Sequence, residues 1–274
     1  MVETFALAED AATPLRSAPD LPTASGALPA GAYTTLRTYG GDGVPFLEDH
    51  VRRLEESCAL QGRPASLDRR RVRAGLAAVL RATRHPESRI RITFAPPDLF
   101  ASIEPFAPLP EKLYEDGAWC VTVPLRREQP QSKDTRFLSS AQGAYGQLPA
   151  GVHEGLLLGP DGALLEGLSS NLFAVVDGVL RTEDVRALHG TTRALVLDLA
   201  RGIVPVSFEA IRPADLGRVA EMFLTSVSRE VLGVGRVDDV RIGRGKPGAL
   251  AKELKKRYRA RMRSVAEHLL GKAT

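Results

Sequence analysis

Cysteine and long apolar runs are both scarce in this chain of 274 residues. The two cysteines, Cys58 and Cys120, are too few for a disulfide framework or a cysteine-rich zinc site, and they favour a reducing compartment. No run of about 18 apolar residues occurs, so we expect no transmembrane helix. Residues 1–20 lack a basic, apolar leader, so we expect no signal peptide and a cytoplasmic protein.

Aromatic residues are also few, at 5%, which weighs against a stacking platform for single-stranded nucleic acid. The net charge is +4, and two basic runs, at residues 69–73 and 252–263, could attract phosphate backbones. Both runs alternate with apolar residues at helical spacing, which is typical of a solvated helix face. We therefore expect no nucleic-acid partner, and a binding protein without enzymatic activity remains an alternative.

The remaining composition is that of a globular protein, with 43% hydrophobic and 26% charged residues. At about 150 residues per domain, the length predicts two domains. Residues 125–135 are polar and contain Pro130, so we interpret them as an interdomain connection. This divides the chain into a small domain, residues 1–124, and a larger one, residues 136–274, with Lys133 at its entrance.

Hydrophobic periodicity predicts strands and helices in both parts, with residues 11–32 as a loop that contains short extended pieces. The expected strands are 32–39, 89–95, 118–124, 154–158, 163–166, 171–176, 179–182, 204–208 and 222–225, and the expected helices are 46–60, 68–83, 190–200 and one from residue 248. Frequent hairpins in the second part favour an α+β fold with antiparallel or mixed sheets. No Gly-x-Gly-x-x-Gly follows a strand and no Walker-type motif occurs, which argues against a doubly wound sheet.

Three features could carry chemistry. Lys133 is either a surface charge or a buried amine able to form a Schiff base. Glu166 ends an apolar strand, where it either belongs to a turn or pairs with a pyridinium nitrogen. Residues 190–193 open a helix with two threonines, which either cap it or bind phosphate, and Ser226 offers a further hydroxyl after a strand.

These features stand in an ordered set of motifs: His50-Val51-Arg52-Arg53-Leu54, Glu166-Gly167-Leu168-Ser169-Ser170-Asn171-Leu172-Phe173, Leu188-His189-Gly190-Thr191-Thr192-Arg193, Phe223-Leu224-Thr225-Ser226 and Gly243-Arg244-Gly245-Lys246-Pro247-Gly248. Lys133 precedes Glu166 by 166 − 133 = 33 residues. In motifs and spacing the chain resembles the fold-type-IV pyridoxal-phosphate enzymes, or class IV aminotransferases. This group includes branched-chain and D-amino-acid aminotransferases and aminodeoxychorismate lyase.

The resemblance implies a small α/β N-terminal domain, a larger C-terminal pseudo-barrel domain and pyridoxal 5′-phosphate between them. It implies that Lys133 forms the Schiff base and moves the substrate proton, that Glu166 pairs with the pyridine nitrogen, and that Leu188 packs against the ring. The residues that would hold the phosphate are Arg53, Thr191, Thr192 and Ser226. The residues that would contact substrate are Tyr33, Arg91, Val227 and Ser228.

The resemblance also implies a homodimer that transfers an amino group between a branched-chain-like amino acid and a 2-keto acid. The alternative on the same scaffold is an aminodeoxychorismate lyase, which releases 4-aminobenzoate and pyruvate. The pair Thr34-Thr35 is similar to the lyases. No metal is expected, because the histidines lack ligand spacing, and His50 is interpreted as helix packing.

The chain departs from these relatives at three places. Phe137 stands where branched-chain enzymes carry a tyrosine shortly after the lysine. Residues 96–100 lack the Arg-x-His carboxylate trap of D-amino-acid enzymes, and Val227 stands where relatives often have threonine. The motifs therefore leave substrate specificity open.

Overall fold

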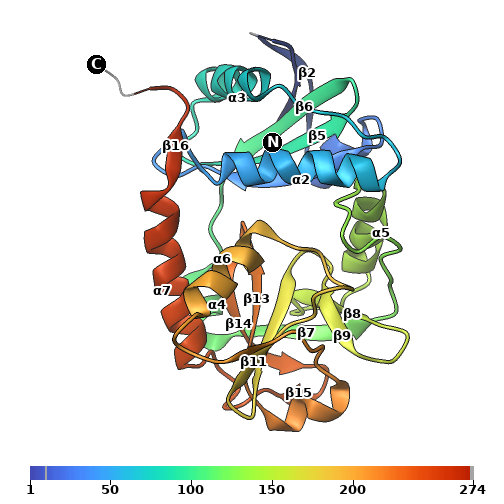
Figure 1. Cartoon of the computed structure of the whole chain (residues 1–274), viewed down its shortest axis with the longest axis vertical. Helices are drawn as coiled ribbons and strands as arrows, with labels where there is room; N and C mark the ends of the chain where they lie inside the picture. The colour runs from blue at the N-terminus through green and yellow to red at the C-terminus, as the bar shows by residue number, and fades with distance from the viewer. Residues whose placement is uncertain (10, 272–274) are drawn as a thin grey trace. The chain divides into compact units, whose positions relative to one another are not determined.

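The structure is a computed structural model that describes residues 1–9 and 11–271. Its residues form two compact units, neither of which is continuous in sequence (Figure 1). The first unit contains Met1–Ala107, Ser132–Ser139 and Met262–Thr274, and the second contains Pro108–Gln131 and Ser140–Arg261. Lys133 thus belongs to the same compact unit as the N-terminal residues.

The first unit is built on an antiparallel sheet in the order β2-β1-β6-β5-β3. Its strands are β1 (Val2–Leu7), β2 (Ala12–Ala18), β3 (Ala32–Arg37), β5 (Ser88–Ala95) and β6 (Asp98–Pro105). Helices α2 (Leu47–Leu60) and α3 (Arg69–Thr83) share one apolar core with the sheet (Figure 1). The short helix α1 (Leu21–Gly26) contacts Arg91 of β5, and β4 (Gly43–Pro45) pairs with β16 (Ala266–His268).

The two long helices of this unit form where periodicity predicts them. In α2, the buried Val51, Leu54 and Cys58 recur at a spacing of three and four residues and face the core. The Asp68 carboxylate caps α3 by accepting a 2.7 Å hydrogen bond from the Arg70 amide. Arg84 ends α3 in the left-handed conformation, with φ of 52°.

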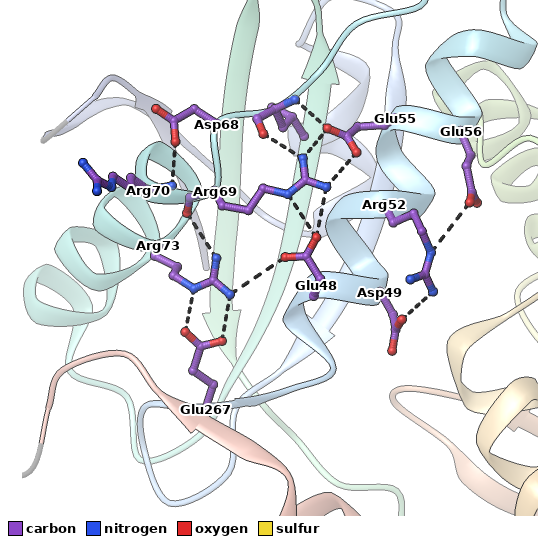
Figure 2. Close-up of polar contacts among 11 residues, drawn as sticks. Glu48, Asp49, Arg52, Glu55, Glu56, Asp68, Arg69, Arg70, Arg73 and Glu267 are labelled. Atoms are coloured by element: carbon purple, nitrogen blue, oxygen red, sulfur yellow. Dashed lines mark hydrogen bonds and ion pairs between the residues drawn. The ribbon is translucent and has the colours of Figure 1, made fainter.

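The basic run of α3 is engaged by carboxylates (Figure 2). Arg69 donates to Glu48 at 3.0 Å and to Glu55 at 2.8 Å. Arg73 donates to Glu267 at 2.6 Å and thereby connects α3 to β16. This arrangement matches the interpretation of the run as a solvated helix face.

The second unit contains a nine-stranded mixed sheet whose middle part closes on itself. Its strands are β7 (Ala118–Val123), β8 (Glu154–Leu158), β9 (Leu164–Gly167), β10 (Asn171–Val176), β11 (Val179–Arg181), β12 (Val206–Ser207), β13 (Val219–Ser226), β14 (Glu230–Val237) and β15 (Val240–Arg241). The order β10-β13-β14-β7-β8-β9 returns to β10 through the pairing of Glu166 with Asn171, so six strands form a closed barrel. The fold is α+β, as the sequence predicts.

Several helices accompany these sheets: α4 (Glu111–Asp116), α5 (Thr135–Gly146), α6 (Thr191–Ala200), the 3-10 helix η1 (Pro213–Arg218) and α7 (Ala249–Ser264). Within the described residues, none of the helices combines the length and apolar character needed to cross a membrane. Cys58 and Cys120 are both buried and free.

The structure differs from the sequence-based expectation at several segments. The strands β1, β6 and β14 and the helix α4 were not predicted. Residues 11–32, expected as a loop with short extended pieces, contain the seven-residue strand β2 and the helix α1. The central residues of β2 are exposed, so this strand lacks the apolar alternation by which strands are recognised. The helix α5 was also not predicted, because Ser139, Ser140 and Gly143 obscure its helical pattern.

Candidate functional site

Lys133 is held by the edge of the first sheet. Its carbonyl accepts a 2.9 Å hydrogen bond from the Tyr33 amide, and its own amide donates to Ser57 Oγ of α2 at 3.0 Å. Two residues later, the Thr135 amide donates to the Gly31 carbonyl, and the Gly31 amide donates to the Thr135 hydroxyl oxygen. The Lys133 Nζ atom lies 4.7 Å from the centre of the Tyr33 ring. These contacts fix the backbone that carries the lysine and place Tyr33 beside its amine.

Arg53, on α2, is a buried cation with an incomplete set of partners. Its side chain donates to Thr34 Oγ1, while its Nε atom is buried without a hydrogen-bond partner. Across the part of the chain that the structure describes, Arg53 forms no ion pair with a carboxylate. Burial lowers its pKa to about 10, so it remains protonated at neutral pH. An unpaired buried charge is costly, and this one fits an anionic ligand such as a phosphate group.

Arg91, on β5, is a second buried arginine of this kind. Its Nη1 atom donates to Ser25 Oγ at 2.8 Å and to the Leu21 carbonyl at 3.2 Å. Its Nε atom has no hydrogen-bond partner, and among residues 1–9 and 11–271 it has no ion-pair partner. Burial lowers the pKa of Arg91, and its guanidinium carbon lies 5.2 Å from the centre of the Tyr33 ring. Arg91 therefore offers a second anion-binding group, next to Tyr33.

The two arginines lie on opposite faces of the first sheet. Thr34, which contacts Arg53, and Tyr33, which contacts Arg91, are neighbours in β3, and neighbouring side chains of a strand point to opposite faces. The two cations are therefore suited to separate anionic groups.

Glu166 lies in the second unit, at the end of β9, and only 2% of its surface is exposed. Its Oε2 atom accepts hydrogen bonds from the Leu188 amide at 3.1 Å and from Asn171 Nδ2 at 3.4 Å. Its Oε1 atom lies 3.3 Å from Arg127 Nε, in an ion pair that is almost fully buried. The cation and the two N–H groups stabilise the negative charge of the carboxylate and fix its orientation.

The start of α6 is connected to this carboxylate. Asn171 donates to the Leu188 carbonyl at 2.7 Å, two residues before the N-cap residue Gly190. No side chain caps the amides at the start of α6, where Thr191 and Thr192 lie. Amides at a helix start favour an anion. The sequence-predicted residues Glu166, Leu188, Thr191 and Thr192 are thus brought together.

Ser226 ends β13, where it is next to the strand that contains Asn171. Asn171 pairs with Thr225 across β10 and β13. The Ser226 hydroxyl oxygen accepts a 3.2 Å hydrogen bond from the Arg229 amide, which leaves its hydrogen available for a ligand. Val227 and Ser228 occupy the turn that follows, before β14.

A buried polar cluster supports the turn after Glu166. Ser170 donates to the Glu154 carboxylate at 2.9 Å, and the Tyr145 hydroxyl bonds to the same carboxylate. Arg229 lies 3.4 Å from Glu154 and donates to Ser169 at 2.7 Å. The cluster therefore connects the turn at residues 167–170 with the turn that follows Ser226.

Sequence reasoning did not identify several of these supporting residues. Asn171 lies within a quoted motif and Thr34 within the noted threonine pair, so both had a signal without an assigned role. Arg127 lies in the stretch interpreted as a connection, and Ser57 is one small residue among several on α2. No local pattern marks their partners, which are distant in sequence.

Comparison with known proteins adds a family match, one similar sequence and two similar solved structures. Residues 31–237 match the family model described as amino-transferase class IV. A Methanocaldococcus jannaschii protein, assigned as a branched-chain-amino-acid aminotransferase, is 30% identical over 253 residues, which cover 84% of this chain and 86% of that protein.

Two solved structures are also similar. A Thermotoga maritima protein, assigned as a branched-chain amino acid aminotransferase, superposes with a TM-score of 0.78 at 25% identity and covers 95% of this chain and 96% of its own. The 4-amino-4-deoxychorismate lyase of Pseudomonas aeruginosa superposes with a TM-score of 0.70 at 26% identity, covering 90% of this chain and 95% of its own.

Proposed function

Because the chain belongs to the amino-transferase class IV family, we propose that it is a pyridoxal-phosphate-dependent transaminase acting on a branched-chain-like amino acid and a 2-keto acid. The observation that carries the cofactor assignment is Arg53, a buried guanidinium whose Nε atom lacks a partner. A phosphate group would supply the anion that this cation lacks. The sequence motifs and the relatives' names support the same assignment.

The bound cofactor would supply an electron sink for the carbanion that forms when the substrate Cα–H bond breaks. In the proposal, Lys133 carries the cofactor covalently and, when released, takes and returns the Cα proton. Glu166 would accept a hydrogen bond from the protonated pyridine nitrogen. Its partners Asn171 and Arg127 hold the carboxylate in a fixed orientation.

The phosphate is assigned to Arg53 and to the groups at the start of α6 and the end of β13: Thr191, Thr192 and Ser226. Leu188 is assigned to packing against the ring. Anchoring by several groups would keep the cofactor in place while its covalent partner changes.

Arg91 and Tyr33 are proposed to bind the substrate carboxylate. Arg91 has an unsatisfied Nε atom, and the Tyr33 ring lies near both Arg91 and the Lys133 amine. A carboxylate held by Arg91 would therefore lie on the same side of β3 as Tyr33. Val227 and Ser228 are proposed as further substrate contacts.

The second candidate is aminodeoxychorismate lyase, the activity named for the Pseudomonas aeruginosa structure. Thr34 bonds to His50 and Arg53, whereas Thr35 lies on the face of β3 that carries Tyr33. Thr35 pairs with Arg91 across the sheet, so its hydroxyl is available at the proposed substrate side. This hydroxyl is the observation that favours the lyase.

Product stoichiometry separates the two activities. Cofactor-loaded enzyme would be mixed with one branched-chain amino acid and no keto acid. The proposal predicts one equivalent of keto acid per cofactor, with turnover only after a second keto acid is added. Continuous pyruvate release from aminodeoxychorismate without an acceptor would identify the lyase instead. Lys133→Ala should abolish either activity, while Lys112→Ala, at an exposed lysine, is the control.

We also propose a homodimer, as the family resemblance implies. Light scattering of the purified chain tests this, and a folded, active monomer would contradict it.

A further inference from the structure

We propose that Thr34 and His50 are positioning residues that orient Arg53 toward the cofactor phosphate. This inference rests on the proposed function, because it takes the assigned ligand of Arg53 as its starting point. It concerns a chain of hydrogen bonds that is completely contained in the first unit and linked to α2 and β3.

The three side chains are buried together. The exposed fractions are 8% for Arg53, 3% for His50 and 0% for Thr34. Arg53 Nη2 donates to Thr34 Oγ1, which lies 2.7 Å from His50 Nδ1. Arg53 Nη2 is itself 3.4 Å from His50 Nδ1. Water has little access to these groups, so each must find its partner within the protein.

The donor and acceptor capacities fix the direction of the chain. A guanidinium only donates, so Thr34 accepts from Arg53. Arg53 Nη2 also lies 3.4 Å from His50 Nδ1, and because a guanidinium only donates, Nδ1 accepts and has a lone pair toward which the Thr34 hydroxyl hydrogen points. The imidazole is therefore neutral, with its proton on Nε2. One end of the Arg53 guanidinium is thus held, and its unpartnered Nε edge is left for a ligand.

The surrounding charges favour the neutral imidazole. The charged groups that face His50 are Arg53 on its own helix and Lys133 on the segment along β3, and both are cations. Burial and these two cations lower the pKa of His50 well below its ordinary value of 6.5. Protonation would place a hydrogen on Nδ1, so Thr34 would lose its acceptor and Arg53 would face a second positive charge.

The hydrogen bonds among Arg53, Thr34 and His50 should affect binding of one part of the cofactor, its phosphate group. If Thr34 and His50 act through Arg53, they matter for the phosphate and not for the aldehyde or the ring. Their loss should then weaken binding of pyridoxal 5′-phosphate and leave binding of pyridoxal, which lacks the phosphate, unchanged. A role in packing alone would affect both ligands alike.

The substitutions are chosen to separate hydrogen bonding from packing. Thr34→Val keeps the shape of the side chain and removes the hydroxyl. His50→Leu removes the acceptor, whereas His50→Asn places an amide oxygen near the position of Nδ1 and cannot be protonated. Thr4→Val is the matched control, because Thr4 is a buried threonine of the same sheet whose hydroxyl bonds to Ser102 at 3.0 Å.

Both ligands would be titrated into each full-length apoprotein. We expect Thr34→Val and His50→Leu to weaken pyridoxal-phosphate affinity by about tenfold, the equivalent of one hydrogen bond. His50→Asn should restore most of the affinity, and Thr4→Val should leave it unchanged. Affinity for pyridoxal should be the same in all four variants.

A pH series supplies a second readout. Wild-type affinity for the phosphate-bearing ligand should fall below that of His50→Asn as the pH decreases toward the pKa of His50. The ionisation of the ligand's own phosphate is common to both proteins, so their ratio isolates the imidazole.

The outcomes distinguish failure of the positioning role from failure of the proposed function. If the variants lose affinity equally for pyridoxal phosphate and pyridoxal, or if His50→Asn does not restore the affinity for pyridoxal phosphate, the positioning role is overturned. If Arg53→Met weakens phosphate-dependent binding while Thr34→Val and His50→Leu do not, the inference fails and the proposed function stands. If the wild-type protein binds no pyridoxal phosphate, the proposed function fails and the inference fails with it.

Discussion

Glu166 and Asn171 face each other across β9 and β10, and their pairing closes the barrel of the second unit. Asn171 also bonds through one side-chain nitrogen to Glu166 and to the Leu188 carbonyl. The residue proposed to control the ring nitrogen is therefore located where the barrel closes. Its position is set by the sheet as well as by its own hydrogen bonds.

Gly190→Ala should disturb this arrangement without changing any polar group. A Cβ atom at residue 190 would lie 2.3 Å from Asn171 Oδ1, so Asn171 would have to move. Loss of its hydrogen bonds should weaken cofactor affinity by about tenfold in a titration. Gly143→Ala in α5 is the control, because a Cβ there meets no atom within 4 Å. Equal affinity in both variants would contradict the role of Asn171.

Glu166→Gln should separate catalysis from stability. Without the negative charge, the pyridine nitrogen loses its partner, and we expect the rate of the half-reaction to fall by about 10- to 100-fold. Loss of the buried ion pair with Arg127 should lower the free energy of unfolding by about 3–5 kcal/mol. Adding Arg127→Met should recover stability in urea unfolding but not the rate. Recovery of both would show that Glu166 has only a structural role.

Arg91→Met should act on substrate rather than on cofactor. Removal of a charged donor to the substrate carboxylate should raise KM for the amino acid by about 10- to 100-fold. The KM of Arg91→Lys should lie between those of Arg91→Met and the wild type, because a lysine retains the charge without the planar pair of donors. Steady-state kinetics with saturating cofactor measures this. An unchanged KM would remove Arg91 from the substrate site.

His50 should make stability depend on pH on the acid side. Burial lowers its pKa in the folded chain, while the unfolded chain titrates near 6.5. Above pH 6.5 the His50 imidazole is neutral in both the folded and the unfolded chain, so it does not reduce the free energy of unfolding. As the pH falls below 6.5, the unfolded chain binds a proton that the folded chain does not, so the free energy of unfolding decreases by up to about 1.4 kcal/mol per pH unit.

Unfolding of the wild type and of His50→Asn between pH 7 and acid conditions tests this sign. The wild type should lose more stability than the variant. Parallel curves would mean that folding leaves the pKa of His50 near its ordinary value, which would contradict the burial of a neutral imidazole between two cations.

The sequence predicted those elements whose residues carry their own signal. Apolar spacing located α2 and α3, and Asp177-Gly178 located the hairpin between β10 and β11. The extent of β2 was not predicted because its middle is exposed. The helix α5 was not predicted because its serine and glycine residues weaken the helical pattern. The α+β class followed from the hairpins, whereas the closure of the barrel depends on one pairing that no local pattern encodes.

The residues of the candidate site likewise fall into those that a local motif marks and those that only the fold brings near. Lys133, Glu166 and Thr191 were identified as candidates because they belong to motifs with a fixed spacing. The partners that orient them are contacts between distant residues, such as Arg127 with Glu166 and Ser57 with Lys133. His50 was interpreted as helix packing, and its position beside Thr34 and Arg53 became visible only when β3 and α2 were placed together.

Covalent trapping tests the central claim most directly. Purified protein would be incubated with pyridoxal phosphate, reduced with borohydride, digested and mapped by mass spectrometry. The account predicts one modified peptide, with the label on Lys133, and its disappearance when an excess of amino-acid substrate is added before reduction. A label on other lysines alone, or no label, would contradict the assignment of Lys133 and with it the proposed transaminase.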